Sequence, residues 1–235
     1  MTVATRGSLL ESLNALLAQD KATAALRGRH FRERDVAFCE IVGEAAANAL
    51  ERAHLLDSFQ RANQHLERLA ITDGLTGVYN HRYFRERLQE EYERAARYSL
   101  PLACMLMDVD DFKNVNDTYG HLQGDKALIE IASRILAAVR TNDIVARYGG
   151  EEFVVLLPQT PLEGATFQAN RLLHAISGEP YDGMPEGAQV TVSIGMTILD
   201  ASTMKDSSAV VAVSDAALYQ AEAEGKNRVI VRKKL

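Results

Sequence analysis

Residues 147–153 of this chain read Arg-Tyr-Gly-Gly-Glu-Glu-Phe and run directly into an apolar segment, Val-Val-Leu-Leu, at 154–157. Two adjacent glycines between strand-like runs predict a tight hairpin turn. Glycine tolerates positive φ and lets a backbone approach a ligand closely. The two glutamates place negative charge at this opening, which suits a hard divalent cation. Taken alone, the segment is equally compatible with a solvated acidic turn, because turns are often rich in glycine and charge.

The composition of the chain is that of an ordinary globular protein. Its 235 residues are 47% hydrophobic and 25% charged, which allows one or two domains with a sizeable core. The net charge of −6 argues against broad binding to nucleic acid or to anionic membranes. No apolar run approaches the roughly 20 residues that span a bilayer, and Cys39 and Cys104 are expected to be buried, reduced thiols. We therefore expect a cytoplasmic protein with no nucleic-acid partner and no membrane segment.

The chain changes character near residue 71. Before it the sequence reads as helical, with leucines at helical spacing between Leu9 and Leu17, a break at Gly28, and no proline between residues 32 and 69. Near the end of this region, apolar residues step by four, three, four and three positions, at Leu55, Phe59, Ala62, Leu66 and Leu69. This period of 3.5 predicts a parallel helical pair, although one amphipathic helix packed on its own domain would show it too. We expect a helical region at 1–54 and a coiled-coil signalling linker at 55–70.

After residue 71 the pattern alternates between helices and strands. Amphipathic spacing predicts helices at 81–98, 124–140, 161–177 and 206–224. Apolar and β-branched runs predict strands at 101–107, 143–148, 152–157, 189–199 and 228–232. This mixture predicts an α/β domain in which helices pack on one face of a sheet.

A second acidic group follows the strand expected at 101–107. Residues 108–117 read Asp-Val-Asp-Asp-Phe-Lys-Asn-Val-Asn-Asp. Carboxylates at the end of a buried strand emerge at a sheet edge, where Mg²⁺ can share its ligands between the protein and substrate phosphates. Lys113 can offset phosphate charge. The alternative is an acidic loop that caps a helix, which becomes weaker because an acidic hairpin and a lysine accompany it.

Four segments together resemble the GGDEF family of diguanylate cyclases. They are 73–77 (Asp-Gly-Leu-Thr-Gly), 108–117, 120–125 (Gly-His-Leu-Gln-Gly-Asp) and 149–153 (Gly-Gly-Glu-Glu-Phe). The resemblance covers about residues 70–232, so a GGDEF domain is expected at 71–235. It implies a palm-like α+β nucleotidyl cyclase fold, with a central, mainly antiparallel sheet and packed helices. It also implies condensation of two GTP into cyclic di-GMP with release of two pyrophosphates.

The resemblance assigns a metal and catalytic set. Asp108, the carbonyl of Val109, Glu151 and Glu152 would hold Mg²⁺ (or Mn²⁺). Glu151 and Glu152 would also be catalytic, the latter as a ligand or as the group that helps to deprotonate the attacking 3′-hydroxyl. Lys113 would stabilise phosphate charge during transfer.

The resemblance also assigns substrate contacts. Asn116 and Asp125 would read guanine, because a carboxylate accepts from the guanine N1–H and N2–H₂ and an amide donates to its acceptors. The backbone around Phe112 and Lys113 would cradle phosphates, and His121 would lie near the base or ribose. From the residues alone, Asn116 could equally be a turn residue and Asp125 a charge at a helix N-terminus.

The chain departs from the family pattern near its end. Residues 219–222 read Tyr-Gln-Ala-Glu and 225–227 read Gly-Lys-Asn. Glu222 stands where the family usually has a lysine that is expected to contact the terminal phosphates, and Lys226 stands where it usually has an arginine. Glu222 would repel a triphosphate unless it turns outward or pairs with Lys226 at i+4, and Lys226 lacks the bidentate fork of arginine. We therefore expect weakened GTP affinity.

A second site is suggested by Arg140 and Asp143, an Arg-x-x-Asp pair that in this family binds cyclic di-GMP as an inhibitor. Arg171 stands where a supporting arginine is often found. From the residues alone, and without their position before the Gly-Gly turn, Arg140 and Asp143 would be interpreted as a simple surface salt bridge. Because each domain holds one GTP, the family chemistry also implies a homodimer through the N-terminal helices.

Two further questions stay open at this stage. Residues 31–35 and the helix to Ala53 resemble the last helix of a GAF sensor domain, so 1–54 is either a truncated GAF remnant or a divergent dimerisation region. The competing function is a catalytically weak or inactive GGDEF receptor for cyclic di-GMP or GTP, which Glu222 favours. An adenylate or guanylate cyclase of the related palm fold is disfavoured by the Gly-Gly-Glu-Glu-Phe turn and by the Arg140/Asp143 pair.

Overall fold

The computed structural model describes residues 15, 19, 33–185 and 189–233, and it has two compact units, Met1–Arg68 and Leu69–Leu235. The leucine-rich helix expected between Leu9 and Leu17 and the break at Gly28 lie outside the described residues. In the described part of the chain, no helix is both long enough and apolar enough to cross a bilayer.

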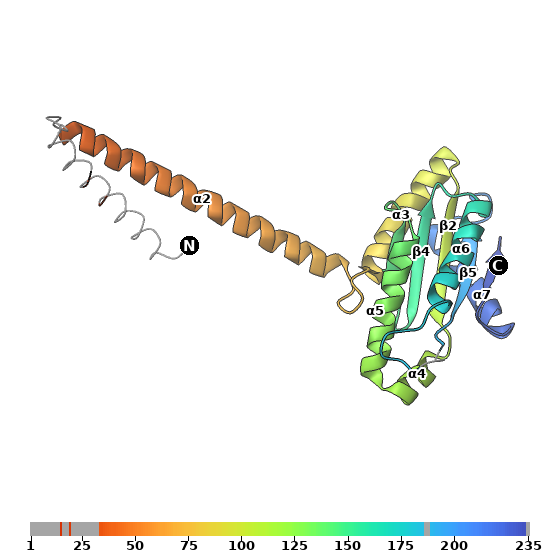
Figure 1. Ribbon diagram of the computed structural model, residues 1–235. Coiled ribbons are helices and arrows are strands. Elements are labelled where there is room, and N and C mark those ends of the chain that lie inside the picture. The colour runs from red at the N-terminus through yellow and green to blue at the C-terminus, as the bar shows by residue number, and fades with distance from the viewer. Residues whose placement is uncertain (1–14, 16–18, 20–32, 186–188, 234–235) are drawn as a thin grey trace. The chain divides into compact units, whose positions relative to one another are not determined.

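The described part of the first unit is dominated by one long helix, α2 (Glu33–Ile71), shown in Figure 1. Leu55 and Phe59, the first two residues of the expected seam, are 64% and 71% exposed. Two further exposed apolar residues lie at equivalent positions of the helix, Ile41 two heptads before Leu55 and Phe38 three heptads before Phe59. The side chains of the other three seam residues are not among those described: Ala62, Leu66 and Leu69. The division at residues 54 and 55 stays a prediction, since α2 runs through it.

The second unit is built on a sheet (Figure 1). In the described residues six strands form it, in the order β1-β3-β4-β2-β5-β6. They are β1 (Tyr79–Asn80), β2 (Leu102–Val109), β3 (Ile144–Arg147), β4 (Glu152–Pro158), β5 (Val192–Ile198) and β6 (Val229–Arg232). The central pairs β3-β4, β4-β2 and β2-β5 are antiparallel, and β1-β3 and β5-β6 are parallel. The expected mainly antiparallel sheet is confirmed.

Five helices accompany the sheet in the described part of this unit. They are α3 (His81–Tyr98), α4 (Phe112–Tyr119), α5 (His121–Ala138), α6 (Leu162–Ser177) and α7 (Ser207–Ala223). The helices expected at 81–98, 161–177 and 206–224 are confirmed, and α5 begins before the expected residue 124. The sequence reading missed α4 and β1, because eight and two residues are too few to show a clear period.

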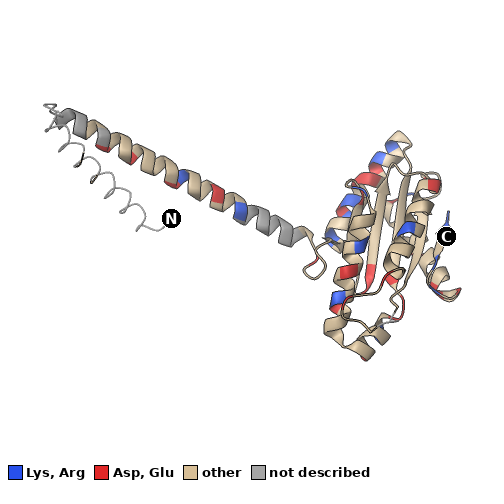
Figure 2. Ribbon diagram, in the orientation of Figure 1, with Lys and Arg blue, Asp and Glu red and all other residues tan. Residues whose placement is uncertain are grey.

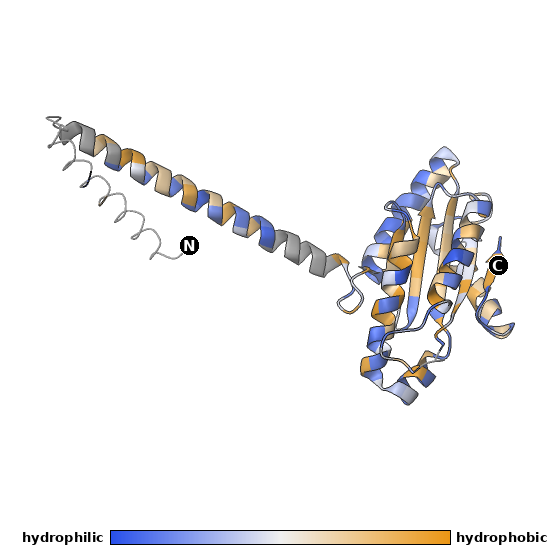
Figure 3. Cartoon of the chain, in the orientation of Figure 1, coloured by the Kyte–Doolittle hydropathy of each residue, from blue (hydrophilic) through white to orange (hydrophobic). Residues whose placement is uncertain are grey.

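The helices cover both faces of the sheet, which corrects the expectation of one covered face. Alternate residues of β2 enter two different cores. Met105 and Met107 pack with α5 and α6, whereas Cys104 and Leu106 pack with α3 and α7. A strand buried on both faces reads as a continuous apolar run, and Figure 3 shows the central strands in hydrophobic colours. Cys104 is a buried free thiol, as expected, and the side chain of Cys39 lies outside the description.

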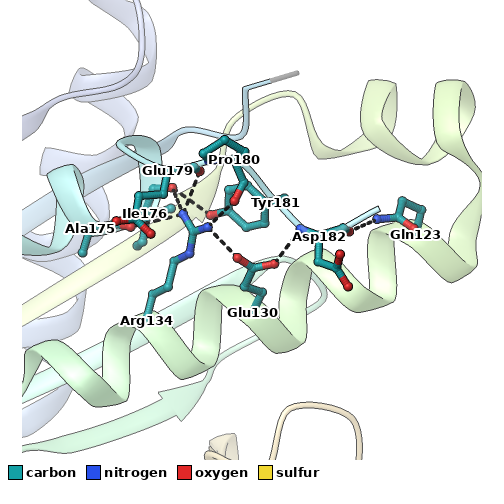
Figure 4. A network of polar contacts seen from close by, with 9 residues as sticks. All are labelled: Gln123, Glu130, Arg134, Ala175, Ile176, Glu179, Pro180, Tyr181 and Asp182. Atoms are coloured by element: carbon teal, nitrogen blue, oxygen red, sulfur yellow. Dashed lines mark hydrogen bonds and ion pairs between the residues drawn. The ribbon is translucent and has the colours of Figure 1, made fainter. Parts of the chain in front are cut away.

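A polar network on α5 holds the segment that follows α6 (Figure 4). The Arg134 guanidinium lies 4.0 Å from the centroid of the Tyr181 ring and donates to four backbone carbonyls, those of Ala175, Ile176, Glu179 and Pro180. Glu130 pairs with Arg134 and accepts from the Asp182 N–H at 3.2 Å. Gln123 donates to the Asp182 carbonyl at 2.7 Å. The chain is therefore fastened to α5 down to the first turns of this helix, beside Gly124.

Candidate active site

The two acidic segments meet at one edge of the sheet. Asp108, near the end of β2, lies opposite Glu152, the first residue of β4, in the antiparallel register. Glu151 precedes β4 in the turn, and the Tyr148 N–H donates to the Glu152 carbonyl at 2.8 Å, which closes the expected hairpin. Figure 2 shows acidic residues gathered at the lower end of the sheet.

The carboxylates at this edge perturb one another. Burial raises the pKa of Asp108 to about 7, and the nearby charges that add to the shift are those of Glu151, Glu222, Glu152 and Asp110. Burial also raises the pKa of Glu152, with further contributions from the charges of Asp215, Glu151 and Glu222. Carboxylates that repel one another in a partly buried place ionise reluctantly. A cation bound among them would relieve this repulsion.

The donor set fits a hard divalent ion that is shared with a substrate. Within the described residues, no three acidic, histidine or cysteine side chains already converge on one point as a finished metal site. Mg²⁺ does not require such a cage, because it is held by one or two carboxylates and takes its remaining ligands from water and phosphate. Asp108, Glu151 and Glu152 supply carboxylate oxygens of the kind it prefers.

Lys226 and Glu222 lie on the same side of this edge. The Lys226 ammonium pairs with Asp111 at 2.6 Å rather than with Glu222. Burial raises the pKa of Glu222, the charge of Asp110 adds to the rise, and the charge of Lys226 opposes it. Because the charge of Glu222 also raises the pKa of Asp108, this residue belongs to the acidic group. The i+4 ion pair with Lys226, one of the two ways in which Glu222 could avoid repelling a triphosphate, is therefore not formed.

The start of α4 separates a core residue from an exposed one. Asp111, at the N-cap, has φ +54° and makes no capping hydrogen bond with its side chain. Phe112 is buried in the core, whereas Lys113 is exposed. The side chain of Phe112 therefore anchors the helix, and only its backbone can line the site.

Asn116 and Gly124 bring α4 and α5 together. A Cβ at Gly124 would lie only 1.9 Å from Asn116 Oδ1. Gly120, with φ +84°, makes the sharp turn between the helices. His121 and Asp125 are exposed on the first turns of α5. The structure thus places the predicted guanine-reading residues on two adjoining helix segments.

Arg140 and Asp143 lie in a separate pocket of about 830 Å³. The Asp143 carboxylate accepts from the Arg140 N–H at 2.7 Å, so the pair closes a turn instead of forming a simple salt bridge. Burial raises the pKa of Asp143, although this hydrogen bond and the charges of Arg140 and Arg171 oppose the shift. Arg171 donates to the carbonyl of Ala138 and to Gln168. The three predicted inhibitor-binding residues are therefore close enough to interact.

A comparison with protein families decides the identity of the second unit. The family model described as "Diguanylate cyclase, GGDEF domain" matches residues 70–228. This range is more than half of the 235 residues. The chain belongs to the GGDEF family.

Named relatives agree with this assignment. Response regulator PleD of Caulobacter vibrioides is 38% identical over 183 residues, which are 77% of this chain and 40% of PleD. Diguanylate cyclase DgcP of Pseudomonas aeruginosa is 37% identical over 223 residues, which are 93% of this chain and 32% of DgcP. This GGDEF protein thus spans less than half the length of either relative.

A solved structure confirms the fold. The coiled coil and GGDEF domain of DgcB from Caulobacter crescentus, in complex with c-di-GMP, matches with a TM-score of 0.72 and 25% sequence identity. The match covers 80% of this chain and 99% of that one. The palm-like cyclase fold expected from the sequence is therefore that of the GGDEF domain.

Arg147 links the Gly149-Gly150 turn of the GGDEF domain to the first residues of this domain. Its guanidinium donates to the Gly150 carbonyl at 2.6 and 2.9 Å and to Asp73 at 3.2 Å. Burial tends to raise the pKa of Asp73, but hydrogen bonds from Thr76 and the charge of Arg147 outweigh it and hold that pKa below its ordinary value. The conformation of the turn thus depends on a residue just after α2.

Sequence reasoning missed part of the Arg140 pocket of the GGDEF domain. Arg87 and Arg94 on α3 also line it, together with Glu91. Glu91 is only 4% exposed and pairs with both arginines, at 3.1 and 3.2 Å. The sequence does carry a signal for this group, because Arg87 and Arg94 lie four residues before and three residues after Glu91, on one helix face. Which pocket this face lines depends on contacts that are distant in sequence.

Proposed function

We propose that this protein is a diguanylate cyclase that condenses two GTP into cyclic di-GMP and two pyrophosphates. The observation that carries the proposal is the register that sets Asp108 against Glu152 at the edge where α4, the helix that carries Lys113, begins. A relative named as a diguanylate cyclase, DgcP, supports it. We further propose that the protein acts in the cytoplasm.

The acidic edge would hold the metal. Asp108, the Val109 carbonyl, Glu151 and Glu152 would bind Mg²⁺ or Mn²⁺, which when bound offsets phosphate charge and makes a hydroxyl easier to ionise. The 3′-oxygen of each GTP forms a bond to the α-phosphorus of the other, and each time the bond to the departing pyrophosphate breaks, which releases two pyrophosphates. Glu152 would take the hydroxyl proton, a role that suits its raised pKa.

Cationic side chains and backbone N–H groups would bind the phosphates of GTP. The first N–H groups of α4, near Phe112 and Lys113, have no intrahelical acceptors, and the exposed ammonium of Lys113 can reach a phosphate. Lys226 would exchange its partner Asp111 for the terminal phosphates. Glu222 adds negative charge to the same region, which weakens triphosphate binding.

Guanine would be read between α4 and α5. Asn116 and Asp125 offer an amide and a carboxylate that match the guanine edge, with His121 near the base or ribose. Adenine would leave these groups mispaired, which gives discrimination against ATP.

Regulation would come from the second pocket and from dimerisation. Arg140, Asp143 and Arg171 would bind cyclic di-GMP, since guanidinium groups pair with phosphates and a carboxylate accepts from guanine. Each domain holds one GTP, so two chains must meet. The exposed seam of α2, which includes Leu55 and Phe59, would join them as a homodimer and raise the effective concentration of the two sites.

A single incubation tests this proposal against its alternatives. The protein is mixed with GTP and Mg²⁺, and the product is identified by mass. Cyclic di-GMP supports the proposal. GTP binding without turnover indicates the receptor that Glu222 favours, and cyclic GMP indicates the related nucleotide cyclases.

A further inference from the structure

A buried carboxylate beside the proposed metal ligands has no role in the chemistry above. Asp110 is 8% exposed and joins three segments that are far apart in sequence. Its Oδ1 accepts from Ser193 Oγ at 2.7 Å, and its Oδ2 accepts from Thr191 Oγ1 at 2.7 Å and from the Asn227 N–H at 3.0 Å. The Asp110 N–H donates to the Thr191 carbonyl at 2.9 Å. The carboxylate thus fastens the end of β2 to the start of β5 and to the loop after α7.

The loop that Asp110 holds has an uncommon backbone. Gly225, Lys226 and Asn227 have φ values of +113°, +61° and +48°. Left-handed conformations cost free energy in residues other than glycine, and they persist where the surroundings fix them. The Gly225 and Lys226 N–H groups are satisfied by carbonyls at the end of α7, those of Glu222 and Ala221. The Asn227 N–H is instead satisfied by Asp110, so this carboxylate fixes the loop to the sheet edge.

Lys226 directly precedes the residue that Asp110 binds. Its ammonium reaches Asp111, the neighbour of Asp110, at 2.6 Å. The backbone and the side-chain end of Lys226 are therefore both held at one corner, where β2 ends and α4 begins.

We infer that Asp110 is a positioning residue that holds the loop at 225–227 so that Lys226 meets the terminal phosphates of GTP. The inference rests on the proposed function, which gives Lys226 its phosphates. Burial of a charge without such partners is unfavourable, so an apolar residue would serve better if packing alone were needed. A carboxylate that accepts three hydrogen bonds is instead suited to fixing geometry.

A double-mutant cycle on the full chain separates positioning from a merely structural role. The probe is guanosine 5′-(α,β-methylene)triphosphate, which cannot release pyrophosphate, and its affinity is measured by calorimetry with Mg²⁺. Asp110→Ala should weaken binding about tenfold, the value of one hydrogen bond to a charged group. In a Lys226→Gln background the same change should weaken binding less than about twofold. If the two substitutions weaken binding independently, so that their fold-losses multiply in the double variant, the inference is overturned.

Two further variants guard against misfolding. Asp110→Asn keeps the shape and can still accept from the Asn227 N–H, so it should bind within about threefold of the wild type. Thr191→Val removes one donor from the same oxygen and should weaken binding about threefold, an effect that Lys226→Gln should also abolish. If Asp110→Ala does not fold, the Thr191→Val cycle decides, and multiplying losses there contradict the inference.

Failure of the inference about Asp110 can be distinguished from failure of the proposed function. If the wild type binds the probe but forms no cyclic di-GMP from GTP, the proposed function fails while the cycle still tests Asp110. If it forms cyclic di-GMP and the losses multiply, the positioning role alone fails. A wild type that does not bind the probe contradicts both.

Discussion

Asn116 fills the space that any side chain at position 124 would need. A Cβ on Gly124 would lie 1.9 Å from Asn116 Oδ1 and 3.2 Å from Phe112 Cζ. The residue that we propose reads guanine is thus placed by the absence of a side chain on its neighbour. The sequence motif contains both residues, but only the structure shows that they touch.

Gly124→Ala should displace the half-buried Asn116 amide and weaken binding of the guanine triphosphate analogue about tenfold, as expected for a lost hydrogen bond to the base. The fold should persist, because the clash involves the end of a side chain. Gly74→Ala is the matched control, since a Cβ there has open space and no positive φ is involved. Calorimetry that finds equal affinities for the two variants would contradict this placement of Asn116.

The raised pKa of Asp108 should make the proposed metal binding depend on pH. Its folded-state pKa of about 7 lies above the ordinary value of 3.8, mainly through burial and then through the charge of Glu151. The metal-free folded protein therefore binds more protons than the unfolded chain between about pH 4 and pH 7, and its stability falls as the pH rises through that window. Above it, Mg²⁺ meets an ionised site without competition from a proton.

Mg²⁺ should accordingly raise the melting temperature more at pH 8 than at pH 6. Thermal unfolding with and without Mg²⁺ at both pH values measures this. Asp108→Asn serves as the control and should lose most of the Mg²⁺ effect at either pH. A wild-type gain that is independent of pH would refute the coupling.

Close contact between α7 and β5 sets the position of the helix that carries Glu222. A Cβ on Gly195 would lie 2.1 Å from the Leu218 N and 2.2 Å from the Ser214 carbonyl oxygen, both of which are backbone atoms. Gly195→Ala should therefore push α7 away and lower the free energy of unfolding by about 3 kcal/mol. Urea unfolding measures the change. Gly164→Ala, which meets the methyl group of Thr160 at 3.3 Å, is the comparison and should be nearly neutral.

The pocket between α3 and the turn before β3 is the proposed binding site for the inhibitory product. Arg140→Ala should relieve product inhibition and raise the yield of cyclic di-GMP at high turnover, because a phosphate-binding guanidinium is lost. The progress curve from GTP measures this. Arg82→Ala on the exposed part of α3, whose side chain does not line the pocket, should leave the curve unchanged. A wild-type-like curve for Arg140→Ala would sink the inhibitory role.

Most of the helices and strands were predictable, including the four-residue strands β3 and β6, but α4 and β1 were not. The continuous apolar run of β2 and the amphipathic spacing of α3 and α6 identify these elements from sequence. The eight residues of α4 are too few to show a period, and helices on both faces were missed because the faces of a doubly buried strand look alike. Asp110 and Asp73 were also missed as site residues, since they have partners elsewhere in the chain. Arg87 pairs locally with Glu91, but the pocket that it lines is formed by residues distant in sequence.

For the whole molecule, the proposed chemistry requires two chains. Phe59→Asp with Leu55→Asp should weaken the homodimer and reduce cyclic di-GMP formation by at least about tenfold at low protein concentration, because a charge at a seam position opposes helix pairing. Light scattering measures the molecular mass of the assembly. The dependence of the rate of cyclic di-GMP formation on protein concentration gives the reaction order in protein. Gln60→Asp with Arg61→Asp alters outward positions and should change neither. Normal dimerisation of the seam variant would rule out this surface.

We propose above all that this GGDEF protein makes cyclic di-GMP at the edge where Asp108 meets Glu152. This is tested most directly by the mass and rate of formation of the product from GTP and Mg²⁺, for the wild type beside Glu151→Gln. We expect cyclic di-GMP from the wild type and at least about a hundredfold slower formation by the variant, the effect of losing a group that stabilises the transition state. No cyclic di-GMP from a wild type that binds GTP, or equal rates for the two proteins, would contradict it.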